Sequence, residues 1–442
     1  MLWDVVVVGG GPAGLFASVS AAEMGARTVL LERMGSPGRK LLVSGGGQCN
    51  LTHGGEIGAF LGHYGGGDRP GVAGRFLRPA LYAFSNTDLA AYCARRGVPL
   101  AEAPDGHVFP SSRRAQDVLD LLLSEARRRK VEIRTGVRAR FVKVEQEGFA
   151  VVASDHGGPA ARGRTLVLST GGRSYPALGT TGDGYRLAAS LGHRIVPPCP
   201  ALVPVIVERA AFAPFVRCAG VSLSAATGTV VREGRRVAKL QGDVLFTHRG
   251  LSGPAVLDLS RYVLRGDVLR VSLVPGLGDV RAAEQRLAEE IEAHGKRTVV
   301  NLLQGLGLAT CLARAVVVAA HLDPRAKAAE ICRPVRRSLA TSLAAGGEGG
   351  HPFPVLSLGG WSEAMVTQGG VCLSEVDPKT MGSRLVPGLF FAGEILDVDG
   401  DTGGYNLQAA VSTGRLAGRN AAQVPVATPG PPAPRDSGQA VR

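Results

Sequence analysis

The chain has 442 residues, enough for two or three domains of ordinary size. Hydrophobic residues make up 45% and charged residues 20%, a globular balance that excludes general disorder and a coiled coil. The net charge of +13 permits polyanion binding, but no run of five like charges occurs and aromatic residues make up only 5%. We therefore do not expect nucleic acid as the partner.

The seven cysteines are scattered, with no CxxC pair and no zinc-type spacing. Unpaired thiols of this kind are typical of a reducing cytoplasm, and they argue against a disulfide reductase. The first apolar run, Val5–Val8, is too short for a signal peptide, and no stretch of 18 apolar residues occurs. We predict a cytoplasmic protein with neither a membrane span nor a metal site.

The N-terminal residues predict a β-strand, a glycine turn, a helix and a second strand. Asp4–Val8 is a β-branched run suited to a strand buried on both faces of a parallel sheet. The turn Gly9–Gly14 follows, then a helix of small residues over Ala13–Met24. Arg27–Leu31 predicts the second strand, which ends at Glu32. This order is typical of a nucleotide-binding βαβ unit.

The next part of the chain is unusually rich in glycine. Residues 35–74 predict a long loop, of which we expect the first half to be functional and the second half to be mobile. Further on, we predict helices over Thr87–Arg96 and Ala115–Arg129, and strands over Val131–Ile133, Ala139–Val144, Phe149–Ala153 and Thr165–Leu168.

From about His193 the pattern changes to alternating apolar segments that predict a small antiparallel sheet or barrel. We predict strands at Leu202–Val207, Val221–Val231, Val268–Leu273 and Val355–Val371, helices within Val280–Ala345, a strand leading into a loop at Gly388–Glu394, and a last helix over Tyr405–Ala422.

These elements predict an α/β fold whose nucleotide-binding domain is split by an insertion. The expected boundaries are 1–192 and 372–423 for the nucleotide-binding domain, 193–277 and 350–371 for an inserted β-barrel-like domain, 278–349 for a small helical subdomain, and 424–442 for a disordered Pro-rich tail.

The strongest motif is Gly9-x-Gly11-x-x-Gly14 between a strand and a helix. Gly9 allows the tight turn, Gly11 lets the backbone approach a pyrophosphate, and Gly14 lets the helix pack against the strand. The phosphates then lie at the helix N-terminus. Glu32, eighteen residues after Gly14, can accept both hydroxyls of a ribose. The motif predicts binding of an ADP group and leaves NAD and FAD open.

Two further stretches carry binding residues. In Arg39–Thr52, three consecutive glycines can wrap a phosphate or a flat ring, Lys40 or Arg39 can supply charge, and Asn50 and Thr52 can supply hydrogen bonds. Near the C-terminus, Glu394 ends an apolar strand and can bind a ribityl hydroxyl.

The turn Gly403-Gly404 then opens the last helix. It would let the positive end of the helix dipole approach a reduced flavin. The acidic residues just before this turn lack the later Glu of a calcium-binding loop.

The sequence resembles the aminoacetone oxidase/BaiN-type group of NAD(P)/FAD-dependent oxidoreductases, a branch of the flavoproteins with two dinucleotide-binding domains. The resemblance spans nearly the whole chain in order. It rests on GGGPAGL (9–15), GRKLLVSGGGQCNLT (38–52), STGGRSYPALGTTGDGY (169–185), LFTHRGLSGPAVLDLS (245–260), TQGGV (367–371) and FFAGEILDVDGDTGGYNLQAA (390–410).

The resemblance implies FAD as the cofactor and a Rossmann-like domain split by a barrel and a helical insert. The residues predicted to contact FAD, with Val137 acting through its backbone on the adenine, are Gly9, Gly11, Pro12, Ala13, Gly14, Glu32, Arg33, Lys40, Gly46, Gly47, Asn50, Thr52, Val137, Thr170, Gly171, Gly393, Glu394, Gly404, Asn406 and Leu407.

One residue departs from the family pattern: Gln48 stands where the GGGRCN stretch of the family has arginine. A positive charge near the flavin or its phosphates is therefore expected to be missing, and the flavin potential to differ.

The catalytic residues and the electron donor remain open. We expect structural roles for His107, His248, Tyr175 and Cys49 and assign no catalytic residue. No second strand–GxGxxG–helix unit occurs, so either NADH or NADPH binds transiently at the insert or another donor reduces the flavin.

The leading hypothesis is hydride transfer between FAD and a small or medium organic substrate, through NAD(P)H-linked reduction of an activated double bond. The alternatives are an amine oxidase that uses oxygen, a flavin-dependent tRNA-modifying enzyme, and a protein that holds FAD without turnover. The sequence does not indicate the oligomeric state.

Overall fold

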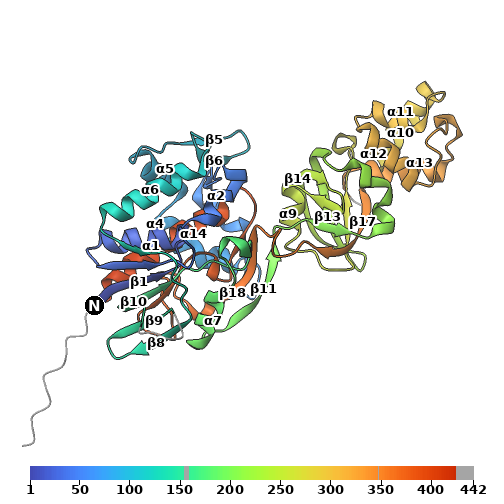
Figure 1. Ribbon diagram of the computed structural model, residues 1–442. Helices are drawn as coiled ribbons and strands as arrows, with labels where there is room; N and C mark the ends of the chain where they lie inside the picture. The colour runs from blue at the N-terminus through green and yellow to red at the C-terminus, as the bar shows by residue number, and fades with distance from the viewer. Residues whose placement is uncertain (154–158, 347, 425–442) are drawn as a thin grey trace, which may run out of the picture.

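The computed structural model describes residues 1–153, 159–346 and 348–424. Figure 1 shows an α/β lobe that contains the N-terminus and the last helix, a β-barrel beside it, and a helical tip beyond the barrel. The predicted tail, 424–442, lies outside the described residues except for Val424. The α/β fold with an inserted barrel and helical part is confirmed. The exact domain boundaries stay a prediction.

The α/β lobe is built on a seven-stranded sheet in the order β7-β2-β1-β10-β9-β8, with β19 pairing the end of β10. Strand β1 lies parallel to both β2 and β10, and its run Val5–Val8 is buried, as predicted for a central strand. The strands are β1 (Leu2–Val8), β2 (Thr28–Leu31), β7 (Glu132–Arg134), β8 (Phe141–Glu145), β9 (Gly148–Val152), β10 (Ala161–Leu168) and β19 (Leu389–Phe391).

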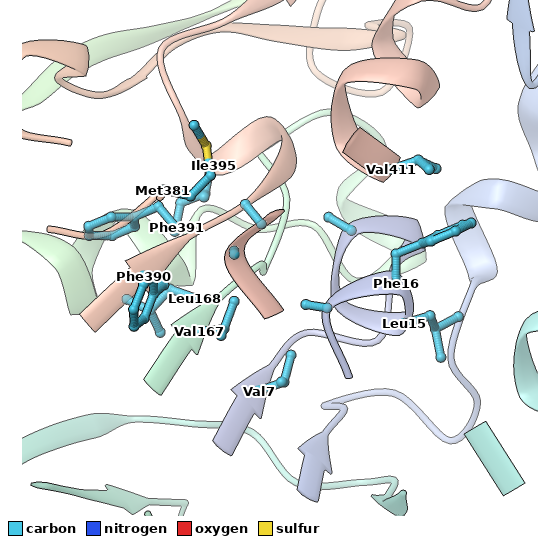
Figure 2. Close-up of a cluster of buried hydrophobic side chains, with 14 of the residues drawn as sticks. Val7, Leu15, Phe16, Val167, Leu168, Met381, Phe390, Phe391, Ile395 and Val411 are labelled. Carbon is cyan, nitrogen blue, oxygen red and sulfur yellow. The ribbon is translucent and has the colours of Figure 1, made fainter. Parts of the chain in front are cut away.

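The first and last helices of this lobe pack against each other and against the sheet. A Cβ on Gly414 would lie 2.3 Å from the carbonyl oxygen of Ala13, so this glycine permits backbone-to-backbone contact. Figure 2 shows the core between these layers, where Val7 and Val167 of the sheet and Phe16 and Val411 of the two helices gather. The helices of the lobe are α1 (Pro12–Glu23), α4 (Val72–Ala83), α5 (Asn86–Ala94), α6 (Ala115–Arg128), α7 (Asp183–Ser190) and α14 (Tyr405–Gln423).

The insert contains a closed barrel with its own apolar core. Its six strands are β12 (Val205–Val207), β13 (Ser222–Arg232), β14 (Arg235–Phe246), β15 (Gly250–Ser252), β16 (Val268–Val271) and β17 (His351–Leu358). The helices attached to it are α8 (Arg209–Phe212), α9 (Pro254–Leu259), α10 (Val280–His294), α11 (Val299–Gly305), α12 (Thr310–Ala319) and α13 (Arg333–Leu343).

Two strands connect the insert to the α/β lobe. The chain leaves through β11 (Ile195–Ala201) and returns through β18 (Val366–Val371), and these strands pair antiparallel to form a two-stranded ribbon. Figure 1 shows this ribbon between the lobe and the barrel. The insert therefore begins and ends at the same place.

The prediction of one long loop over residues 35–74 is wrong. The segment contains α2 (Arg39–Val43), β3 (Thr52–His53), α3 (Ile57–Phe60), β4 (Tyr64–Gly65) and the start of α4. Strand β4 pairs with β20 (Asp399–Gly400), and β3 joins a small sheet with β6 (His107–Pro110) and β5 (Leu100–Glu102). Glycine serves close packing here, since a Cβ on Gly66 would lie 2.0 Å from the carbonyl oxygen of Asp397.

Candidate flavin site

A cavity of about 870 Å³ lies at the carboxyl ends of β1, β2 and β10, where open α/β sheets bind their ligands. Val8, Leu31 and Ser169 mark those strand ends in its wall. From there the cavity extends to the N-terminus of α14 and to one wall of the insert. Its size and extent fit a ligand as long as a dinucleotide.

The structure brings most of the predicted FAD residues to this one cavity. Those that line it are Gly9, Gly11, Pro12, Ala13, Glu32, Arg33, Lys40, Gly46, Asn50, Val137, Thr170, Gly171, Gly393, Glu394, Gly404, Asn406 and Leu407. The predicted residues outside its lining are Gly14, Gly47 and Thr52.

The glycine turn after β1 has the geometry of a phosphate-binding loop. A Cβ on Gly11, the N-cap of α1, would meet no atom within 4 Å, so the helix N-terminus is open toward the cavity. Gly14 has the packing role predicted for it, because a Cβ there would lie 1.9 Å from the carbonyl oxygen of Gly9. The turn therefore fits a pyrophosphate.

Glu32 ends β2 beside this turn. Its carboxylate accepts hydrogen bonds of 2.7 Å from the backbone N–H groups of Gly10 and Met34, which hold it at the cavity wall. The N–H of Val137 donates to the carbonyl of Glu32, so only the carbonyl of Val137 remains for the predicted adenine contact. Arg33 forms an ion pair with Asp183 at 3.1 Å. This end of the cavity fits an adenosine.

The middle of the cavity is crossed by a partly buried ion pair. The ammonium of Lys40 lies 2.6 Å from Glu394 Oε2 and donates to Ser174 Oγ at 2.5 Å. Glu394 Oε1 accepts from Ser174 Oγ and from the backbone N–H of Thr367. The second and third sequence motifs therefore meet here, at the position expected for the ribityl chain.

The N-terminus of α14 forms the far end of the cavity. Gly404, its N-cap, has a φ of +99°, and a Cβ there would lie 2.3 Å from the carbonyl oxygen of Thr52. Thr52 itself donates to Gln408, so it positions the helix instead of lining the cavity. The Asn406 side chain bonds both backbone groups of Gly400 and thereby fixes the turn before the helix. The helix dipole points at the space expected for the flavin ring.

The three-glycine loop lies at this same end. A Cβ on Gly45 would be 3.5 Å from the ring of Phe109, a cavity residue on β6. We expected a positive charge to be missing at Gln48, but the structure places another one there. Arg113 donates to Gln48 Oε1 at 3.4 Å and lies over the Phe109 ring. A guanidinium from a separate segment thus stands beside Gln48.

The insert supplies an apolar wall that sequence reasoning missed. Its cavity-lining residues are Leu202, Pro254, Leu257, Met365 and Val366. They come from three separate segments of the chain, namely the end of β11, α9 and the start of β18. No sequence motif could therefore have identified these residues as one wall.

A buried charge network attaches α9 to the turn before α14. The guanidinium of Arg261, only 3% exposed, pairs with Asp399 at 2.5 Å and with Asp401. Asp258 accepts from the backbone N–H and the hydroxyl of Thr402. Since Asp401 and Thr402 line the cavity, the insert helps to shape its far end.

The four side chains for which we expected structural roles lie in different surroundings. Cys49 is buried, and burial raises its pKa to about 12, so its thiol stays neutral. His248 is exposed and away from the cavity. Tyr175 and His107 line the cavity. No helix in the described part of the chain is both long and apolar enough to cross a bilayer.

Comparison with known proteins agrees with this geometry. The family model described as "HI0933-like protein Rossmann domain" matches residues 3–420. The chain is 33% identical over 438 residues to a 3-dehydro-bile acid delta(4,6)-reductase of Clostridium scindens, covering 95% of this chain and 99% of that protein. It is also 33% identical over 424 residues to a ribosomal RNA dihydrouridine synthase of Escherichia coli, covering 93% and 96%.

A solved structure has a similar fold. It is a 3-ketosteroid-delta4-(5alpha)-dehydrogenase from Rhodococcus jostii in complex with 4-androstene-3,17-dione, with a TM-score of 0.50, 19% identity, and coverage of 96% of this chain and 97% of that one. At this identity the likeness concerns the fold alone. The family match, which spans nearly the whole chain, confirms the resemblance found in the sequence: the protein belongs to the HI0933-like family of FAD-dependent oxidoreductases.

Proposed function

We propose that the protein uses FAD and NAD(P)H to reduce a carbon–carbon double bond activated by a neighbouring carbonyl group. One observation carries the proposal: most of the predicted FAD residues and the apolar wall of the insert line the same cavity. A small or medium organic substrate would lie against Leu257 and Val366, with its reacting carbons facing the flavin ring.

The residues of the chain have separable tasks in this reaction. Bound FAD would supply the redox chemistry by accepting a hydride from the nicotinamide and passing it to the substrate. Lys40 and Glu394 would hold the ribityl chain, and the N-terminus of α14 at Gly404 would stabilise negative charge on the reduced ring. The apolar wall would exclude water from the reacting carbons.

The names of the two relatives support the direction of the reaction. One is called a delta(4,6)-reductase and the other a dihydrouridine synthase. Forming dihydrouridine means saturating the double bond of uracil next to its carbonyl. Both names therefore describe reduction of a conjugated double bond, which favours a reductase over the amine oxidase alternative.

Anaerobic stopped-flow absorbance tests the proposal. Protein saturated with FAD is mixed with NADH or NADPH, and then with an α,β-unsaturated ketone. We expect the nicotinamide to bleach the flavin band and the ketone to restore it. If neither nicotinamide bleaches the band but an amine does, the protein is an oxidase and the proposal is wrong.

A second candidate function is reduction of uracil in RNA. The net charge of +13 and the name of the Escherichia coli relative favour it. RNA that binds tightly with a steep salt dependence, and that gains dihydrouridine on incubation with NAD(P)H, would support this candidate.

A further inference from the structure

His107 lies at the flavin end of the cavity. It begins β6, which pairs with β3 so that His107 stands opposite His53 in the register. The Nε2 atom of His107 lies 3.5 Å from the point that a Cβ on Gly403 would occupy. The imidazole thus faces the turn that opens α14, where the reacting ring of FAD is expected.

An acidic neighbour orients this imidazole. His107 Nδ1 lies 2.7 Å from Asp105 Oδ2, at ion-pair distance although not in good hydrogen-bond alignment. The other carboxylate oxygen accepts from the backbone N–H of His107 at 3.2 Å. Slight burial would raise the pKa of Asp105, but these contacts with His107 lower it, so the carboxylate stays ionised beside the ring. Nε2 is left directed at the cavity.

The other acidic group near Gly403 is already engaged by two partners. Among the described residues, the carboxyl and imidazole side chains that line the cavity near Gly403 are Asp105, His107 and Asp401. One oxygen of Asp401 pairs with Arg261 and the other lies 2.9 Å from His63 Nδ1. Both oxygens of Asp401 are therefore occupied by neighbouring side chains, which leaves His107 as the candidate donor.

From this geometry we propose that His107 is the proton donor of the reduction and that Asp105 is its positioning residue. The inference rests on the proposed function. A hydride from bound reduced FAD forms a C–H bond at the β-carbon, and the π electrons of the double bond move toward the α-carbon and its carbonyl. The α-carbon takes the proton from Nε2 of His107. The substrate gains two electrons, which derive from NAD(P)H, and solvent reprotonates the imidazole.

Groups from three elements surround His107. Asp105 faces it from its own turn, and His53 of β3 lies with its ring centroid 5.8 Å away. Tyr405 of α14 approaches the same point beside Gly403. Asp105 is the acidic group among these neighbours, so Asp105→Asn removes the carboxylate from beside the ring.

The experiment separates the two half-reactions of the FAD-loaded protein. Wild type and the variants His107→Gln, Asp105→Asn and His248→Gln are reduced with dithionite and then mixed anaerobically with 2-cyclohexenone. We expect His107→Gln to slow flavin reoxidation by about 100-fold or more. FAD affinity and the rate of reduction should stay within about twofold of wild type. The exposed control His248→Gln should behave as wild type throughout.

A second readout does not depend on activity. In protein labelled at histidine Cε1, the resonance missing from His107→Gln identifies His107, and Asp105→Asn should move this resonance because the carboxylate beside the ring is gone. If wild type is reoxidised by the enone and His107→Gln matches it in rate and pH profile, the proton-donor role is wrong while the reductase survives. If enones do not reoxidise wild type at all, both proposals fail.

Discussion

The Lys40 ammonium and the Glu394 carboxylate lie 2.6 Å apart, although 354 residues separate them in the sequence. Their side chains are 23% and 19% exposed, so the pair is largely shielded from water. It ties α2, which follows β2, to the turn after β19. Besides the packing of α1 on α14, this ion pair therefore joins the two sequence parts of the α/β lobe inside the cavity.

Breaking this pair should weaken both FAD binding and the fold. In Lys40→Met, Glu394 keeps its bonds to Ser174 and Thr367, so we expect a loss of about 1–3 kcal/mol in the free energy of unfolding. FAD affinity should fall in parallel. Urea unfolding and flavin titration of Lys40→Met, Glu394→Gln and the double variant check this. Strictly additive single losses would show that the two groups are not coupled.

Gly14→Ala should disturb the phosphate-binding turn. The new Cβ would overlap the carbonyl oxygen of Gly9, and relieving the clash moves α1 away from β1. We expect a stability loss of about 1–3 kcal/mol and a lower FAD content in the purified protein.

Gly305→Ala is the matched control, because that glycine is also helical and a Cβ there would meet nothing within 4 Å. It should stay within about 1 kcal/mol of wild type. Equal effects of the two changes would contradict the packing role of Gly14.

Arg261→Met should be one of the more destabilising single changes in the protein. It leaves Asp399, whose side chain is fully buried, without its positive partner. We expect a loss of about 3–5 kcal/mol by thermal or urea unfolding. Arg265→Met removes an exposed arginine from the same loop and should change stability by less than about 0.5 kcal/mol. A similar, small loss for both variants would rule out a structural role for the Arg261 network.

The carboxyl group of Asp258 predicts a specific pH dependence. Burial raises its pKa to about 6, although the N–H of Thr402 donates to it and opposes the shift. Because the unfolded value is near 4, the folded protein holds this proton more tightly than the unfolded chain, and ionisation costs stability as the pH rises from about 4 to about 6.

Asp258→Asn removes that cost. Relative to wild type, the variant should gain up to about 3 kcal/mol over this range, with no further gain above about pH 7. Urea unfolding of both proteins at several pH values measures the difference. A difference that does not vary with pH would contradict the raised pKa.

The sequence predicted best what is encoded locally. The strand, turn, helix and acidic residue of the first 32 positions are neighbours in the chain, so their spacing alone indicated the βαβ unit. Helix α4 was missed because Pro79 stands inside it and glycines precede it, both of which argue against a helix. Leu202 has a φ of +51°, which is incompatible with an extended strand. The observed strand β12 is therefore shorter than the predicted strand over Leu202–Val207.

The site was predictable only in part for the same reason. The binding motifs could be recognised in the sequence from the spacing of their glycines. Arg261 and Asp399, in contrast, are 138 residues apart, and no sequence pattern links them. Likewise His107 reaches the cavity only because β6 happens to pair with β3. Contacts that depend on tertiary pairing cannot be predicted from the spacing of residues along the sequence.

The antiparallel pair of β11 and β18 has an evolutionary consequence. Because the outgoing and returning chains are hydrogen-bonded neighbours, residues 202–365 form a cassette whose replacement would need only two splice points on a single hairpin-like stem. An exchanged insert would bring a different apolar wall to the cavity, but it would also have to supply a partner for Asp399 in place of Arg261.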